Sequence, residues 1–414
     1  MPYPYLISAD SQFPGTADLN NYVGNQPGTY GPFVVTGDVR YVVTLRPSGG
    51  AQYAGVWKST DAGQTWAEQD GSNRPEVFVG AGYLSCSEAS TTIWVFYVHP
   101  STNEVTAKPF DTSSDTWGSA IGGGPVPAVE SAEQLFNAIR MSSGDMKVVY
   151  ESTYELISPE IIPYSRFGLA TFDGSTWTDH GEIAGQSGET VEFGLGVRPQ
   201  LVEGSSGRLH VFVNSVLNRA SAPEQSHLVH TAIESDNTAS GTWDLIDRLP
   251  DANVGPFSSF GQPTARVNGS DTEIVCGYIW YDGSNKHLKA ARANSSATPS
   301  WTLDTVETSN IPTDNNTFGI GSSALLACGA YGDLAYIIWT TASDLRRRTY
   351  QGAGWSGASV VYNGDAVCNI AINPFADDFG IVLTKGADGT GDCYYYELGA
   401  VPPVTGSRAK YYSY

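Results

Sequence analysis

The sequence predicts an all-β fold, a β-propeller of seven four-stranded blades that forms a single domain over residues 1–399. Two observations lead to this prediction. Short apolar strands recur along nearly all of the 414 residues, and a tryptophan follows six of the seven groups of strands at intervals of roughly 50–65 residues. Short strands repeated in fours at such a period are typical of propeller blades. A string of immunoglobulin-like domains would need linkers about every 100 residues, and none is visible.

Each repeat contains a strongly apolar second strand, a third strand after a variable loop, and a tryptophan that opens the fourth strand. The predicted second strands are Val39–Leu45, Thr92–Val98, Met146–Tyr150, Leu209–Val213, Glu273–Trp280, Leu334–Trp339 and Phe379–Leu383. The third strands are Tyr53–Trp57, Glu104–Pro109, Phe167–Thr171, Leu228–Ala232, Leu288–Ala291, Leu345–Thr349 and Cys393–Leu398. The tryptophans are Trp66, Trp117, Trp177, Trp243, Trp301 and Trp355.

The last repeat lacks its tryptophan and runs into Val401-Pro402-Pro403, where proline cannot donate the hydrogen bond that a ladder needs. Its fourth strand must come from elsewhere, and Tyr3–Ser8 near the N-terminus is the best candidate. Such an exchange closes the ring and covers strand edges. Six or eight blades remain alternatives. Residues 400–414 are then a C-terminal tail, either a frayed end or a segment that docks on a partner.

The turn at Ser59–Trp66 has the pattern S-x-D-x-G-x-T-W between two extended runs. Asp61 and Thr65 carry short oxygens that can bond to nearby backbone N–H groups. Gly63 permits a positive φ, and Trp66 returns a large apolar face to the core. Less complete copies of this turn precede Trp117, Trp177 and Trp355.

These repeats resemble the Asp-box (BNR) repeats of the sialidase-type propeller superfamily over nearly the whole chain. The resemblance implies the propeller fold. Because the Asp-box occurs in hydrolases, lyases and lectins alike, it implies a class of fold more strongly than an activity.

Composition excludes several partners. The formal net charge is −21 and the isoelectric point is near 4.5, so nucleic acid and anionic membranes would be repelled. No apolar stretch approaches the ~20 residues of a membrane span, and the N-terminus lacks the basic and apolar regions of a signal peptide. The five cysteines are widely spaced without a C-x-x-C pair, which indicates free thiols rather than disulfides or a zinc site.

A binding site is expected on the face that carries the loops between second and third strands and between blades, because long loops on a rigid scaffold commonly carry function. Two long insertions there, Glu151–Arg166 and Asn214–His227, belong to adjacent blades. Aromatic rings suit sugar faces, and charged groups bond to hydroxyls or carboxylates. The candidate ligand-binding residues are Tyr154, Glu155, Tyr164, Arg166, Arg198, Arg219, His227 and Trp280.

The histidines, the absence of metal-binding motifs and a run of arginines say less about function. His210 and His230 fall within predicted strands, where structural roles are expected, whereas His227 borders an insertion and is the best candidate acid or base. No metal-binding spacing such as H-E-x-x-H is present, so no metal and no cofactor is expected. The run Arg346–Arg348 alternates faces along a strand, which indicates packing or ion pairing.

The resemblance also suggests two kinds of enzyme. Sialidases of the superfamily carry an early F/Y-R-I-P motif, for which Val39-Arg40-Tyr41-Val42 lacks the proline. Propeller-type polysaccharide lyases use Tyr, His and Arg, and by similarity Tyr164, His227 and Arg198 could serve as that trio.

The sequence therefore favours a propeller that recognises a glycan or a protein partner, with catalysis left open. A recognition surface without an export signal fits a virion protein, such as a receptor-binding component of a phage tail or capsid, made in the cytoplasm and bound to other virion proteins through its tail. The alternative is a polysaccharide-active enzyme, either a sialidase-like glycoside hydrolase or a polysaccharide lyase.

Overall fold

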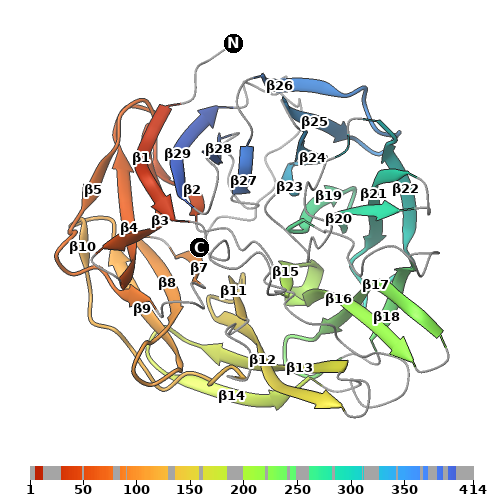
Figure 1. Cartoon of the computed structure of the whole chain (residues 1–414), viewed down its shortest axis with the longest axis horizontal. Helices are drawn as coiled ribbons and strands as arrows, with labels where there is room; N and C mark the ends of the chain where they lie inside the picture. Colours follow the sequence, from red (N-terminus) through yellow and green to blue (C-terminus); the bar gives the residue numbers. More distant parts are fainter. Residues whose placement is uncertain are drawn as a thin grey trace.

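The computed structural model of the chain is a ring of seven antiparallel sheets around a central axis (Figure 1). This confirms the prediction of an all-β propeller with seven blades. Six sheets are built from consecutive strands, and the seventh combines strands from both ends of the chain. The structure describes residues 5–12, 29–48, 51–77, 84–89, 91–128, 136–157, 162–183, 199–219, 222–239, 243–248, 261–281, 285–309, 311, 326–341, 344–363, 367–371, 380–385 and 390–397, in several strands for the backbone alone.

In six blades the strands are stacked from the axis outward in chain order, and in blade 7 the N-terminal strand β1 takes the outermost place. The innermost strands are β2 (Thr29–Thr36), β7 (Leu84–Ala89), β11 (Phe136–Arg140), β15 (Gln200–Glu203), β19 (Thr264–Asn268), β23 (Leu326–Tyr331) and β27 (Val367–Ala371). The second strands are β3 (Val39–Ser48), β8 (Thr92–Val98), β12 (Met146–Ile157), β16 (Leu209–Arg219), β20 (Asp271–Tyr281), β24 (Leu334–Thr340) and β28 (Gly380–Lys385).

The outer half of each blade follows the same order. The third strands are β4 (Ala51–Ser59), β9 (Val105–Asp111), β13 (Ile162–Phe172), β17 (Ala222–Ile233), β21 (Lys286–Asn294), β25 (Asp344–Tyr350) and β29 (Thr390–Glu397). The outermost strands are β5 (Ala67–Gln69), β10 (Thr116–Trp117), β14 (Trp177–Glu182), β18 (Asp244–Arg248), β22 (Thr302–Glu307), β26 (Ser359–Asn363) and β1 (Tyr5–Gln12). A short strand β6 (Glu76–Val77) also pairs with β4, and η1 (Ser205–Gly207) is a 3-10 turn.

The N-terminal strand closes the ring as predicted. β1 pairs antiparallel with β29, from Tyr5 opposite Tyr395 to Gln12 opposite Thr390. The described strand extends to Gln12, beyond the predicted end at Ser8, and two register shifts interrupt its ladder. The seventh blade therefore satisfies the edge of β29 with a segment from the opposite end of the chain.

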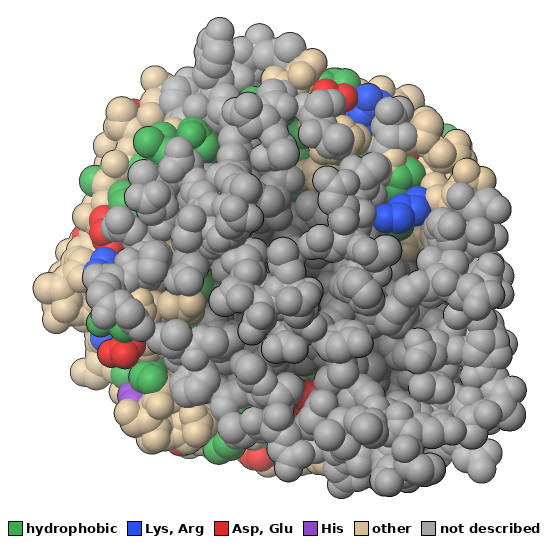
Figure 2. Space-filling view, in the orientation of Figure 1, with side chains coloured by type: hydrophobic (Ala, Val, Ile, Leu, Met, Phe, Trp, Pro, Cys, Tyr) green, Lys and Arg blue, Asp and Glu red, His purple; other side chains and the backbone are tan. Residues whose placement is uncertain are grey.

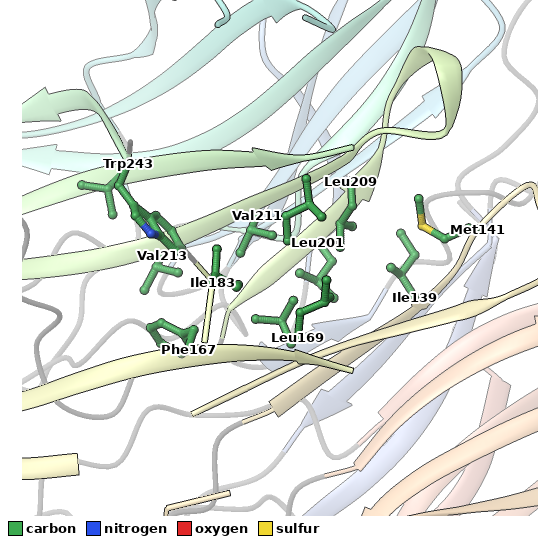
Figure 3. Packing of buried hydrophobic residues seen from close by; sticks show 13 residues of the cluster. Ile139, Met141, Phe167, Leu169, Ile183, Leu201, Leu209, Val211, Val213 and Trp243 are labelled. Carbon is green, nitrogen blue, oxygen red and sulfur yellow. The ribbon is translucent and has the colours of Figure 1, made fainter. Parts of the chain in front are cut away.

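The core is divided among the interfaces between neighbouring blades. Each of the seven interfaces contains its own cluster of buried apolar side chains. Between blades 3 and 4, Phe167 and Leu169 from one sheet meet Val211, Val213 and Trp243 from the next (Figure 3). Because the apolar face of each sheet is covered by its neighbour, no blade buries its core alone.

The six repeat tryptophans all enter this core. Each indole lies in the outermost strand of its blade or in the segment just before it, and it packs into the interface with the preceding blade. Trp117 and Trp243 are 8% and 5% exposed, and the other four are partly buried. The interface between blades 6 and 7 has no such indole and contains the rings of Tyr362 and Tyr396 instead.

The turn at Ser59–Trp66 has the hydrogen bonds that its sequence predicts. Asp61 Oδ1 accepts from the backbone N–H of Thr65 at 2.8 Å, and Thr65 Oγ1 donates to Asp61 Oδ2 at 2.6 Å. The bonds from Thr65, followed by that from Ser59, lower the pKa of Asp61 to about 2. Ser59 Oγ accepts from the N–H of Gly63, and Trp66 Nε1 donates to the Gly63 carbonyl at 2.8 Å.

The turn before Trp355 has lost the aspartate, and charged groups hold its tryptophan instead. Trp355 Nε1 donates to Asp304 of the preceding blade at 2.9 Å. Arg292 bonds to Asp304 and to Glu273, and it also donates to the hydroxyl of Tyr350 at 2.6 Å. In this repeat, polar pairing thus replaces the hydrogen bonds that Asp61 forms in the first turn.

A substitution at Gly63 tests whether the close approach of this turn to Tyr395 contributes to stability. Its φ is +91°, and a Cβ there would lie 2.4 Å from the ring of Tyr395 in blade 7. We expect Gly63→Ala to lower the free energy of unfolding by about 1 kcal/mol from backbone strain and a further 1–3 kcal/mol from overpacking. Thermal or urea unfolding measures the change.

The matched control is Gly174→Ala in the corresponding turn of blade 3. Gly174 has a φ of +97°, but the nearest atom to its Cβ would be 3.8 Å away. This variant should show the strain alone. Equal losses in the two variants would contradict a role for the contact with Tyr395.

Candidate functional site

Antiparallel connections place the turns between third and fourth strands on one face of the ring. The connections between second and third strands, and those between blades, lie on the other face, which we call the loop face. On the face seen in Figure 2, most of the described charged side chains lie toward the rim. The predicted candidates that the structure describes are distributed over blades 3, 4 and 5 toward the loop face.

The two insertions are extended hairpins, so the expectation of long irregular loops was wrong. β12 and β13 stay paired as far as Ile157 and Ile162, and β16 and β17 as far as Arg219 and Ala222. Segments rich in Thr, Tyr, Val and Leu favour a strand, and continued pairing satisfies backbone groups that a loop would leave to water. Both hairpins extend past the predicted strand ends on adjacent blades.

The register places the blade 3 candidates on neighbouring positions of one ladder. Glu155 lies opposite Tyr164, Tyr154 opposite Ser165, and Arg166 opposite Thr153. The side chains of Tyr154, Glu155 and Tyr164 lie outside the described part of the structure, which fixes only their backbone. The candidate carboxylate and one candidate tyrosine are therefore directly cross-strand neighbours.

The blade 4 candidates are likewise placed by backbone alone. His227 lies in β17 opposite Ser215 of β16 and Arg248 of β18. Arg219 is the last residue of β16 and pairs with Ala222. Arg198 lies outside the described residues, so its expected place beside this group stays a prediction.

The side chain of Arg166 forms an ion pair within its own blade. Arg166 Nη1 lies 3.0 Å from Glu182 Oε2, and Thr153 Oγ1 donates to the other oxygen of Glu182 at 3.2 Å. Both charged side chains are more than a third exposed, so such a pair adds little stability. Its charge is compensated locally, which leaves Arg166 less available to an anionic ligand.

Trp280 lies two blades from Arg166, in the interface between blades 4 and 5. The Nζ atom of Lys289 lies 3.7 Å from the centroid of a Trp280 ring, a close cation–π contact. Lys289 also bonds to Asp247 at 3.0 Å, and the Tyr278 hydroxyl donates to the same carboxylate at 2.6 Å. The lysine therefore covers one face of the ring that was expected to stack on a sugar.

Two buried tyrosines near the loop face, Tyr150 and Tyr278, were not predicted from the sequence. Tyr150 donates to both oxygens of Asp179, at 2.9 and 3.1 Å, and Tyr278 donates to Asp247. Burial, followed by the hydrogen-bonded carboxylate, raises the pKa of each tyrosine far above its ordinary range. An alignment of the blades is one signal for these pairs, because Asp179 and Asp247 both lie on outermost strands.

His210 and His230 lie on the opposite side, near the turns, and form a buried chain of polar groups. His210 Nδ1 lies 2.9 Å from His230 Nε2, and His210 Nε2 lies 2.8 Å from Ser295 Oγ. A carboxylate oxygen of Asp244 is 3.9 Å from His230 Nδ1. Neither imidazole is exposed, which agrees with the structural role expected for both.

The described cysteines and potential metal ligands form neither a disulfide nor a metal site. Among the described residues, no group of three or more His, Cys, Asp or Glu side chains is arranged to hold a metal ion. The described Cys86, Cys276, Cys328 and Cys393 are free thiols, as expected from their spacing. In the same part of the chain, no helix has the length and apolar character needed to cross a membrane.

Comparison with known proteins identifies relatives by fold alone. No family model and no curated protein matches the chain. An ulvan lyase of a new polysaccharide lyase family, bound to a -[GlcA(1-4)Rha3S]- saccharide, matches with a TM-score of 0.57 and 10% identity over 96% of each chain. A second polysaccharide lyase matches with a TM-score of 0.55 and 11% identity over 96% of this chain and all 100% of its own.

An α-L-arabinanase from Penicillium chrysogenum, complexed with arabinobiose, matches over 96% of this chain and 99% of its own with a TM-score of 0.45 and 13% identity. At these identities the similarity to the two lyases shows the propeller fold. No family model supports the finer assignment to Asp-box repeats, which stays a resemblance.

The histidine pair predicts a pH dependence of stability. Burial, with His230 and Arg208 beside it, holds the pKa of His210 well below 6.5, and burial also lowers that of His230. Because both pKa values are lowered on folding, the unfolded chain takes up protons at a higher pH than the folded chain. Stability is therefore complete above about pH 6.5 and should fall as the pH drops toward the folded pKa values, by at most about 1.4 kcal/mol per pH unit for each histidine.

Unfolding by urea at a series of pH values checks this slope. His210→Gln removes the group with the larger downward shift and should make the slope below about pH 6.5 shallower. The control, His99→Gln, replaces a partly exposed histidine of blade 2 that lies outside the buried pair. Identical slopes in all three proteins would rule out the buried pair as the cause.

Proposed function

We propose that the chain acts on a polysaccharide at the loop face of blades 3 and 4. The supporting observation is the pair of extended hairpins, β12–β13 and β16–β17, which carry the candidate residues beyond the regular sheets on adjacent blades. Groups held on paired strands are positioned more rigidly than groups on open loops. The full-length similarity in fold to polysaccharide lyases favours an enzyme over the recognition role that the sequence favoured.

The chemistry that these residue types fit best is lyase cleavage of a uronate-containing chain. A base must remove the proton beside the carboxylate, an acid must protonate the leaving oxygen, and a cation must stabilise the negative charge that develops. Tyr164 and His227 are the proposed proton-transfer groups. Arg219 and Arg198 are the proposed cations, because Arg166 is already paired with Glu182.

The net charge of −21 bears on the substrate. The long-range field of the chain opposes an acidic polysaccharide, but salt screens that field within about 10 Å at 0.1 M. Local arginines can then determine binding. The proposed site therefore fits an acidic substrate at moderate ionic strength, and a neutral polysaccharide remains a substrate class for the hydrolase alternative.

One experiment distinguishes the classes. The full chain is incubated with uronate-containing and neutral polysaccharides, and reducing ends and the ultraviolet absorbance of unsaturated uronates are both measured. A lyase produces both signals, whereas a hydrolase produces reducing ends alone. Retention on a glycan array without either signal would overturn the enzyme and support a receptor-binding protein.

If the chain binds a glycan without cleaving it, the role expected from the sequence, a virion component that binds a receptor, applies. In that case we propose that residues 400–414 dock on other virion proteins and that the chain is made in the cytoplasm. Copurification of the chain with assembled particles, lost when the tail is deleted, is the expected result.

If the lyase assay is positive, two variants test the proposed groups. We expect Tyr164→Phe and His227→Gln each to lower kcat/KM by about 10²–10⁴, because each removes a proton-transfer group while keeping the size of the side chain. The control, His180→Gln, changes an exposed histidine on β14 and should keep full activity. Unchanged activity in the first two variants, with unchanged melting temperatures, would place the site elsewhere.

A further inference from the structure

Strand β25 in blade 6 carries three consecutive arginines, and two of them are neutralised by carboxylates. Arg346 Nη2 lies 3.0 Å from Asp344, and Arg348 Nη2 lies 2.9 Å from Glu307 in blade 5. Alternation along the strand puts these two arginines on the side of blade 5. The middle residue, Arg347, therefore points the other way.

Arg347 faces blade 7. Its neighbour on the same side of the strand, Leu345, is fully buried in the interface between blades 6 and 7. The Nε and Nη1 atoms of Arg347 are buried without any hydrogen-bond partner, although the side chain as a whole is partly exposed. No described residue forms an ion pair with it.

Within the described part of the chain, the groups that face this guanidinium are phenols rather than carboxylates. Tyr336 and Tyr396 are the groups that interact with its charge, and burial lowers the pKa of Arg347. The Tyr396 hydroxyl donates to the carbonyl of Val361, and its ring lies 5.7 Å from that of Tyr362. These neutral groups cannot offset a partly desolvated positive charge.

We propose that Arg347 binds an oxyanion, a sulfate or a carboxylate group, in the interface between blades 6 and 7. An arginine matches both groups geometrically, and its hydrogen bonds to an anion are charge-assisted. The side chain is only partly buried, so part of it stays accessible to an anion from solvent. The site is separated from blades 3 and 4, so it does not depend on the proposed polysaccharide site.

Thermal unfolding of the full chain during titration with sodium sulfate or sodium acetate tests the proposal. Sulfate stabilises proteins generally by exclusion, so the informative quantity is the difference between wild type and Arg347→Met. We expect wild type to show an additional, saturating rise in Tm on the order of 2 °C that the variant lacks. Without the anion, the variant should melt at or above the wild-type temperature, because it loses an uncompensated charge.

The matched control is Arg346→Met, which removes the same charge from the adjacent position on the opposite side of β25. It should retain the saturating rise. A third titration with glucose 6-sulfate identifies the source of the anion: saturation at a lower concentration than inorganic sulfate indicates a sugar-borne group, and the reverse indicates a free ion.

Two results would overturn the site. Parallel titration curves for wild type and Arg347→Met would show that no anion binds there. A variant that melts well below wild type in the absence of the anion, or that does not fold, would show that the guanidinium has a structural partner in the protein. Arg347→Lys, which keeps the charge with fewer donors, should give a smaller saturating rise.

Discussion

The fold depends on apolar contact between neighbouring sheets. Every described core cluster combines side chains from two blades, and in six of the seven interfaces an indole from one blade packs against the preceding blade. A four-stranded sheet of this size cannot bury its own face, so an open array would expose apolar surface at both ends. Closure of the ring is therefore a condition for stability, and β1 provides it by joining β29.

The turn at Ser59–Trp66 packs directly against the interface that closes the ring. Gly63 lies against the ring of Tyr395, and Trp66 lies 5.7 Å from the same ring. Tyr395 in turn lies opposite Tyr5 across the joint between the two ends of the chain. The most complete copy of the repeated turn thus occurs beside the joint, where three segments far apart in the sequence must meet.

The sequence predicted the centres of the strands because apolar residues alternate or cluster there, as in Thr92–Val98, whose predicted bounds are those of β8. It did not predict the extended hairpins, since the polar residues after Tyr150 and Val213 resemble a loop until their cross-strand partners are known. The pairing of Arg166 with Glu182 was also invisible, because surface charges carry no periodic signal. Candidate site residues could be assigned to blades, but their chemical neighbours could not.

The interface between blades 6 and 7 follows from the way the ring closes. In the other interfaces the indole comes from an outermost strand or from the segment just before it, which the chain reaches directly from the third strand of the same blade. Blade 7 obtains its outermost strand from the N-terminus, and the residues before β1, Met1-Pro2-Tyr3-Pro4, contain no tryptophan. Phenol rings and Arg347, which has no ion-pair partner among the described residues, occupy that interface instead. When β1 completes blade 7, it covers the open edge of β29 but brings no indole to the interface between blades 6 and 7. The proposed anion site at Arg347 is therefore a consequence of the way the ring closes.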